Sequence, residues 1–183
     1  LCDVSDLAAL IAGSESIERF LQRTVEMVGR HIKATVCSIY LLDEQTNELV
    51  LKATVGFNSA VIGKIRLKIG EGLVGTTLEK LKPVREGLAS RHPKSKYFNE
   101  ACEDPFDSFL AVPLLRGAEK IGVLVVQHRQ RDYFDKIDAL ALRAIARAEK
   151  QAELIMKLLM ERVEAASSQA AAEAGGDAAD EAP

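Results

Sequence analysis

Residues 35–55 read TVCSIYLLDEQTNELVLKATV, and this stretch predicts the centre of the fold. Residues 35–43 are β-branched, aromatic or aliphatic at nearly every position, which is typical of a strand covered on both faces. Residues 43–47 are polar and suit a turn. Residues 48–55 then place Leu49, Leu51, Ala53 and Val55 on one face of a second strand. The stretch therefore predicts a β-hairpin.

A second hairpin is predicted from residues 108–115 and 120–128, joined across 116–119. Pro113 lies inside its first arm and predicts a bulge or an unpaired edge, because proline has no N–H to donate. Four weaker elements are expected between the hairpins. They are an edge strand at 64–69, a short helix at 73–81, a weak strand at 84–88 and a long polar loop at 89–107.

Helices are predicted at both ends of this strand-rich region. Residues 17–32 carry apolar side chains at three- and four-residue steps, which gives one buried stripe. A longer helix is expected from 134 to about 166, and its 4-3 apolar spacing is typical of coiled coils. The element order predicts an α+β sandwich, with a central, mostly antiparallel sheet of five to six strands. The terminal helices would cover one face, and the short helix and long loop the other.

The predicted organisation has four parts. Residues 1–13 form an N-terminal helical segment and 14–150 form the domain. Residues 151–166 extend the last helix for signalling or dimerisation, and 167–183 form a disordered, acidic, alanine-rich linker. The net charge is −3, and four of the 27 acidic residues lie in the last 19 positions without a basic residue. The rest is close to neutral, which argues against nucleic-acid binding.

The cysteine spacing and the hydropathy pattern limit the cellular location and the kinds of site that the sequence supports. Three cysteines without CxxC spacing favour reduced thiols in a cytoplasmic protein over a disulfide framework or a zinc site. No apolar run approaches the roughly 20 residues of a membrane helix. The three histidines are scattered, so no metal site is expected. The turn at Gly70, Gly72 and Gly75 lacks the ending of a nucleotide-binding loop, so a tight strand-to-helix turn is favoured.

The segments CSIYLLDEQTNELVLKATVGFN, IGEGLVG, RHPKSKYF, SFLAVPLL with GVLVVQ, and YFDKIDALAL together resemble a GAF domain over residues 14–150. LKIGEGLVG and DSFLAVPLLRG are similar to the N-terminal sensory GAF domain of nitrogen-type phosphoenolpyruvate–protein phosphotransferases. This resemblance implies a regulatory domain that senses a small effector, with glutamine expected. It also implies downstream phosphotransferase domains in the parent chain, a homodimer through the terminal helices, and no cofactor or catalysis by this part of the protein.

The resemblance places the ligand between the sheet and the short helix plus long loop. The candidate lining residues are Ser38, Tyr40, Leu73, Arg85, Tyr97, Phe106, Ser108 and Leu110. Arg85 is available for a carboxylate and Asp107 or Glu103 for an ammonium group. Phe106, Tyr97 and Leu110 also suit an ordinary core.

Two alternatives stay open. Some GAF proteins reduce free methionine sulfoxide with loop cysteines, and Cys102 lies in the polar loop. The acidic neighbours of Cys102 would raise its pKa and reduce its reactivity, whereas Cys37 is expected to be a buried, inert thiol. The other alternative is a GAF domain that only dimerises, its cavity filled by Tyr40, Phe106 and Leu110.

Overall fold

The computed structural model describes residues 17–95 and 106–147, all of which belong to one compact unit, Glu15–Lys150. Its elements are, in chain order, α2 (Ile17–Ile32), β1 (Val36–Asp43), β2 (Glu48–Val55), η1 (Ser59–Val61), β3 (Arg66–Lys68), α3 (Gly72–Lys80), β4 (Val84–Glu86), η2 (Ala89–Arg91), β5 (Ser108–Arg116), β6 (Glu119–His128) and a helix described over 136–147. The predictions for 1–13, 151–166 and 167–183 lie outside the described residues.

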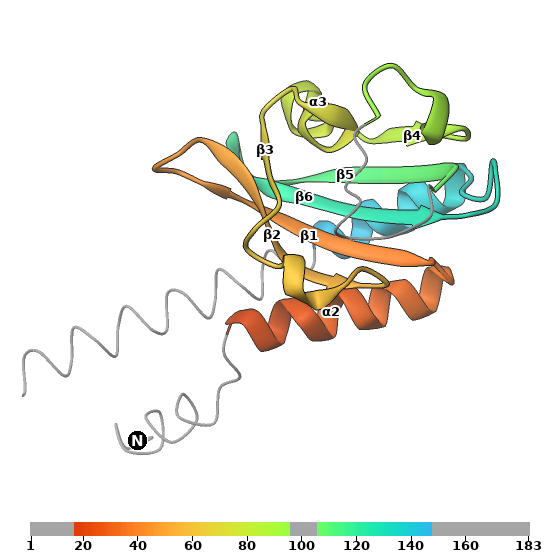
Figure 1. The fold of residues 1–183 in the computed structure, drawn as a ribbon, viewed down its shortest axis with the longest axis horizontal. Helices are drawn as coiled ribbons and strands as arrows, with labels where there is room; N and C mark the ends of the chain where they lie inside the picture. The colour runs from red at the N-terminus through yellow and green to blue at the C-terminus, as the bar shows by residue number, and fades with distance from the viewer. Residues whose placement is uncertain (1–16, 96–105, 148–183) are drawn as a thin grey trace, which may run out of the picture. The chain divides into compact units, whose positions relative to one another are not determined.

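The six strands form a single antiparallel sheet in the order β3-β2-β1-β6-β5-β4. Both predicted hairpins are confirmed, and they join side by side through β1 and β6, with Ser38 opposite Val125. The strand expected at 64–69 is the short edge strand β3. Figure 1 shows this curled sheet between α2 on one side and α3 on the other.

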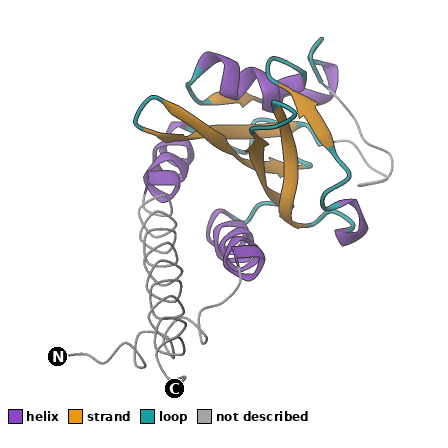
Figure 2. Ribbon diagram, turned by 90° about the vertical axis from the view of Figure 1, so that its left-hand side faces the viewer, coloured by secondary structure: helices purple, strands orange, loops and turns teal. Residues whose placement is uncertain are grey.

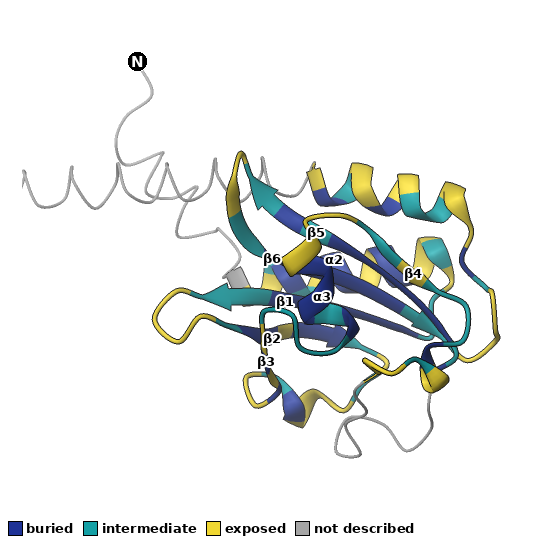
Figure 3. Ribbon diagram, turned by 90° about the horizontal axis from the view of Figure 1, so that it is seen from above, coloured by how far each residue is buried: buried dark blue, intermediate teal, exposed yellow. Residues whose placement is uncertain are grey.

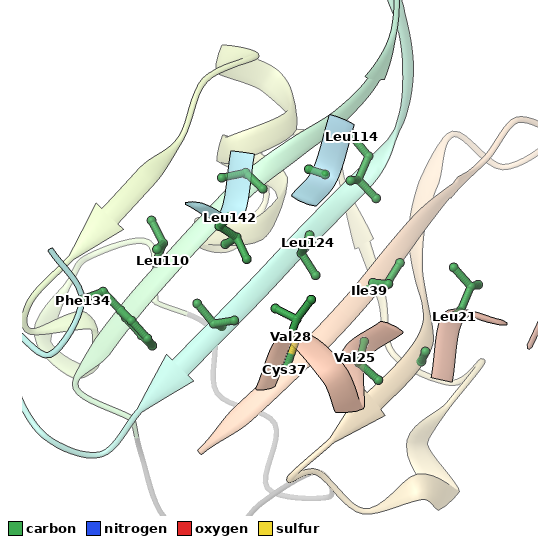
Figure 4. Packing of buried hydrophobic residues seen from close by; sticks show 14 residues of the cluster. Leu21, Val25, Val28, Cys37, Ile39, Leu110, Leu114, Leu124, Phe134 and Leu142 are labelled. Atoms are coloured by element: carbon green, nitrogen blue, oxygen red, sulfur yellow. The ribbon is translucent and has the colours of Figure 1, made fainter. Parts of the chain in front are cut away.

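The helix-side core lies between the sheet, α2 and the helix at 136–147. Its buried side chains include Val25 and Val28 of α2, Ile39 of β1 and Leu142 of the last helix. Figure 4 shows these residues pointing toward one another, and Figure 2 shows both helices on the same side of the sheet. The prediction that the terminal helices share one face is therefore confirmed for their described parts.

A second apolar cluster fills the opposite face, under α3. It joins Leu49 and Leu51 of β2, Val123 and Val125 of β6, and Leu78 of α3. Figure 3 shows the central strands buried along their length, with exposed residues at the turns. Strands β1, β5 and β6 are largely buried on both faces, which confirms the prediction made for residues 35–43.

The start of the last helix differs from the prediction. The last helix begins at 136 rather than at Phe134, because Phe134 is buried in the helix-side core and Asp135 caps the helix. The Asp135 carboxylate accepts from the N–H groups of Ile137 (2.6 Å) and Asp138 (2.9 Å), and the Asp138 carboxylate accepts from the Asp135 N–H.

Pro113 itself lies in register opposite Val123, and β4 pairs only as far as Ala111, so the described sheet shows an unpaired edge at Pro113. The β5–β6 register shift lies between Leu114 and Leu115.

Candidate ligand-binding site

The glycine-rich turn before α3 shapes the cover of the α3 face. Gly70 and Gly72 adopt φ of +86° and +64°, which a side chain disfavours. The Glu71 carboxylate accepts a hydrogen bond from the Lys68 N–H at 2.8 Å, and Thr76 Oγ1 donates to the Gly72 carbonyl at 2.7 Å. A negative carboxylate at the start of α3 opposes phosphate binding, so the structure supports the strand-to-helix turn.

Two of the predicted lining residues, Tyr40 and Leu73, meet in the α3-face cluster. Tyr40 comes from β1, and Leu73 from the first turn of α3. Ser38 lies two positions before Tyr40 on the same strand, so its side chain shares that face. The sheet and α3 thus bring these three residues to one layer.

Ser38 is buried against Thr54 of β2, which sequence reasoning missed. The hydroxyl oxygens lie 2.8 Å apart, and Thr54 Oγ1 also lies 3.4 Å from the Cys37 carbonyl, to which it donates. Ser38 and Thr54 are cross-strand partners.

The predicted single face of Leu49, Leu51, Ala53 and Val55 is wrong, because the β1–β2 register shifts between Ile39 and Tyr40. Leu49 and Leu51 lie in the α3-face cluster, whereas Ala53 and Val55 lie at the helix-side core. This shift, which alternation along β2 does not show, puts Thr54 on the α3 face with Ser38.

The Tyr40 hydroxyl is the exceptional polar group of this layer. Its side chain is 3% exposed, and among the described residues it makes no hydrogen bond. Burial raises the pKa of Tyr40 well above its ordinary value of 10.0, so the phenol is neutral at physiological pH. A buried hydroxyl costs free energy when it lacks a hydrogen-bond partner, and Tyr40 finds none within 17–95 and 106–147, so a polar ligand atom there would offset that cost.

Phe106 is buried and packs against Phe57, with the ring centroids 6.0 Å apart. Phe57 in turn packs on the α3-face cluster. Phe106 therefore lies on the expected side of the sheet. Tyr97 and Glu103 lie outside the described residues.

Three predicted lining residues are not placed with Tyr40, and their expected position is corrected. Leu110 belongs to the helix-side core, as Figure 4 shows. Ser108 shares the Leu110 face of β5, and its Oγ lies 3.4 Å from the Phe134 N–H. Arg85 is the cross-strand partner of Leu110 and donates to the Phe134 carbonyl at 2.9 Å. On β5 it is Phe109 and Ala111 that face α3.

The groups expected to hold an amino acid are likewise engaged elsewhere. Arg85 anchors the start of the last helix. The Asp107 carboxylate accepts a short hydrogen bond from the Ser90 hydroxyl and lies 4.0 Å from Arg131 Nε. A different cation comes close to α3, since Lys94 Nζ donates to Thr76 Oγ1 at 3.3 Å. Lys94 was not among the predicted residues.

The family model for the GAF domain matches residues 14–148. The chain belongs to the GAF domain family. Together with the six-stranded antiparallel sheet, this match confirms the predicted GAF-like α+β fold.

Proteins similar to this GAF domain include a phosphotransferase component. The chain is 27% identical over 116 residues to the phosphoenolpyruvate-dependent phosphotransferase system protein of Escherichia coli K12, covering 63% of this chain but 16% of that protein. The GAF domain of an Acinetobacter phosphoenolpyruvate–protein phosphotransferase superposes with a TM-score of 0.68 at 30% identity, covering 88% of this chain and 92% of that one. The free methionine-R-sulfoxide reductase of Neisseria meningitidis gives 0.63 at 25% identity, covering 91% and 89%.

The described part of the GAF domain offers little for thiol or metal chemistry. Cys37 is a fully buried thiol in the helix-side core, as predicted, while Cys2 and Cys102 lie outside the described residues. His92 braces its loop, because Nδ1 accepts from the Lys94 N–H and Nε2 lies 3.8 Å from Glu86. Within 17–95 and 106–147, no acid, cysteine and histidine cluster suits a metal ion, and no helix is long and apolar enough to span a membrane.

Proposed function

We propose that this GAF domain is a regulatory sensor that binds a small polar effector between the sheet and α3. The observation that carries the proposal is the buried Tyr40 hydroxyl without a hydrogen-bond partner in the described part of the chain. The Ser38–Thr54 hydroxyl pair supplies further polar atoms on the same face. Leu73 and the surrounding cluster supply the apolar contacts that small-molecule sites combine with a few oriented polar groups.

The effector that we propose is glutamine, which makes the domain a nitrogen-status sensor. Its side-chain amide offers both a donor and an acceptor to the Tyr40 hydroxyl. Its carboxylate needs a cation, and Lys94, next to Thr76, replaces Arg85 in that role.

Isothermal titration calorimetry of the whole chain with glutamine tests this site. Tyr40→Phe removes only the hydroxyl, and we expect it to weaken binding by about tenfold. The matched control is Tyr133→Phe, because Tyr133 stacks on His128 and packs on the helix-side core. A flat titration at millimolar glutamine would remove this effector, and equal effects of the two variants would remove Tyr40 from the site.

The parent protein is, in this proposal, a phosphoenolpyruvate–protein phosphotransferase whose catalytic domains follow the GAF domain, and the GAF domain itself has no catalytic activity. The similarity to phosphotransferase GAF domains supports this assignment. The full open reading frame tests it, since a phosphohistidine domain is expected downstream. A reductase remains the alternative reading because of the Neisseria relative, and a thiol-dependent sulfoxide reductase activity lost in Cys102→Ser would establish it.

We further propose that the domain forms a homodimer in the cytoplasm through its terminal helices. Ile137 and Leu140 are 73% and 63% exposed, and they share one side of the last helix with Ala141 and Ala144. This apolar stripe is separate from the buried stripe of Leu142 and Ala146. Sedimentation velocity tests the prediction: Leu140→Glu should shift the protein toward monomer and Lys136→Glu should not. A monomeric wild type at high micromolar concentration would refute it.

A further inference from the structure

A pocket lies at the β4 edge of the sheet, separate from the Tyr40 layer. Its volume is about 250 Å³, and it is lined by residues from α3, β5, the β5–β6 turn and the last helix, namely Leu81, Pro113, Leu115, Gly117, Arg143, Ala146 and Arg147. The pocket has a simple origin. β4 has three residues and pairs only with Phe109–Ala111, so the outer edge of β5 beyond Ala111 has no strand neighbour in the described sheet.

Two guanidinium groups, those of Arg143 and Arg147, border the pocket. Arg143 and Arg147 lie four residues apart on the helix, so both side chains emerge on the same side and their like charges repel. Neither forms an ion pair with any residue in the described ranges, whereas Arg116, at the same end of β5, is paired with Glu119 at 2.5 Å. With two cations at its border, and no ionic partner for either within 17–95 and 106–147, the pocket prefers an anion.

The remaining walls of the pocket are mostly apolar, and one of the residues that form them, Leu81, has an unusual backbone conformation. Leu81 ends α3 in the left-handed conformation, with φ of 53°, at a position where glycine is the usual residue. Its side chain is 45% exposed next to Pro113 and Leu115. Leu81 thus gives the pocket an apolar wall beside the two arginines.

The shape of the pocket selects a compact ligand over a peptide strand. Pro113 lies in the free stretch of β5 and has no N–H, so an added strand would lose part of its hydrogen-bond ladder. The volume of about 250 Å³ is also below that of pockets that hold drug-sized ligands.

We propose that this pocket binds a compact organic anion, a carboxylate or a phosphate monoester on a short carbon skeleton. Arg143 and Arg147 hold the anionic group, because a guanidinium offers paired N–H donors to its oxygen atoms. Leu81, Pro113 and Leu115 cover the carbon skeleton. The site shares no lining residue with the Tyr40 layer, so it does not depend on the sensor proposed there.

The experiment is an amide NMR titration of the whole chain with n-butyl phosphate, butyrate, 1-butanol and inorganic phosphate. The first two probes differ in the anionic group, 1-butanol keeps the skeleton without charge, and inorganic phosphate keeps the charge without a skeleton. We expect saturable shifts at the amides of Leu81, Leu115 and Gly117 with at least one organic anion, and weaker binding of both 1-butanol and inorganic phosphate.

Two variants then assign the binding to the arginines. The double variant Arg143→Gln, Arg147→Gln should weaken the binding of whichever organic anion binds more tightly by about tenfold or more, since each charge-assisted contact is worth about a factor of ten. Lys136→Gln, which removes a charge from the same helix outside the pocket, should leave the affinity within about twofold of wild type. Unchanged amide positions of the core residues show that the variants remain folded.

Three results would overturn the proposal. They are the absence of shifts at the pocket amides with either organic anion up to about 10 mM, equal affinity for 1-butanol, or an unchanged affinity in the double arginine variant. Glutamine binding at Tyr40 is measured separately by calorimetry, so failure at one site is distinguishable from failure at the other.

Discussion

Gly75→Ala separates helix propensity from tertiary packing. Gly75 lies inside α3, where alanine is normally preferred over glycine by about 1 kcal/mol. In this structure, a Cβ atom at position 75 would lie 2.3 Å from the Lys68 carbonyl oxygen and 3.0 Å from the Gly70 nitrogen. Both contacts are with backbone, so no side chain can rotate to relieve them.

The expected sign is therefore a loss of stability. Overpacking of this kind costs about 1–3 kcal/mol, and contact with a fixed carbonyl belongs at the upper end of that range. After subtraction of the propensity gain, the free energy of unfolding should fall by roughly 1–2 kcal/mol. In urea this lowers the midpoint by about 0.5–1 M at an unchanged m-value.

Gly29→Ala is the matched control. Gly29 also lies inside a helix, α2, but its added Cβ would be 3.2 Å from a methyl group of Val55 and 3.4 Å from Cys37 Cβ. These side chains can shift by a few tenths of an ångström, so the propensity gain offsets the crowding to within about 0.5 kcal/mol. The packing argument is refuted if Gly75→Ala is as stable as wild type, or no less stable than Gly29→Ala.

Three further predictions concern buried and titrating groups. Thr54→Val should lower the free energy of unfolding by about 1–3 kcal/mol, because it leaves the Ser38 hydroxyl unpaired. In a double-mutant cycle, adding Ser38→Ala should recover part of that loss. Additive losses in the double variant would exclude coupling between the two hydroxyl groups. Desolvation acts to raise the pKa of Asp43, but hydrogen bonds from Gln45, Arg66 and Thr46 outweigh it and lower the pKa. The stability that ionised Asp43 contributes is thus fully present above its unfolded pKa near 4 and is lost as the pH falls through its pKa in the folded state. In Asp43→Asn, the urea midpoint should therefore fall less steeply with decreasing pH below about pH 4 than in wild type. Because burial raises the pKa of Tyr40, its ionisation in the unfolded state destabilises the protein above about pH 10. The difference in urea midpoint between Tyr40→Phe and wild type should therefore move in favour of the variant between pH 7 and pH ~11. The same midpoint difference at both pH values would contradict the burial of the hydroxyl.

The sequence by itself determined the elements and much of the architecture. The continuous apolar run in residues 35–43 indicated a strand covered on both faces, and β1 is one of the two central strands of the sheet. The charged alternation at 64–69 indicated an edge, where β3 lies. These features follow from local periodicity, since the pattern of apolar and polar residues along a strand reflects how many of its faces are buried.

Only the tertiary structure decided which face each strand turns toward α3. Alternation correctly placed Ser38 with Tyr40 and Ser108 with Leu110, but it could not relate the two pairs to each other. The cross-strand register sets Leu110 opposite Val126, in the helix-side core, while Ser38 lies opposite Val125, under α3. A shift of one residue in that register would exchange the faces. The membership of the candidate site therefore depends on the pairing of β1 with β6, which joins Ser38 to Val125, far along the chain, and which no local pattern contains.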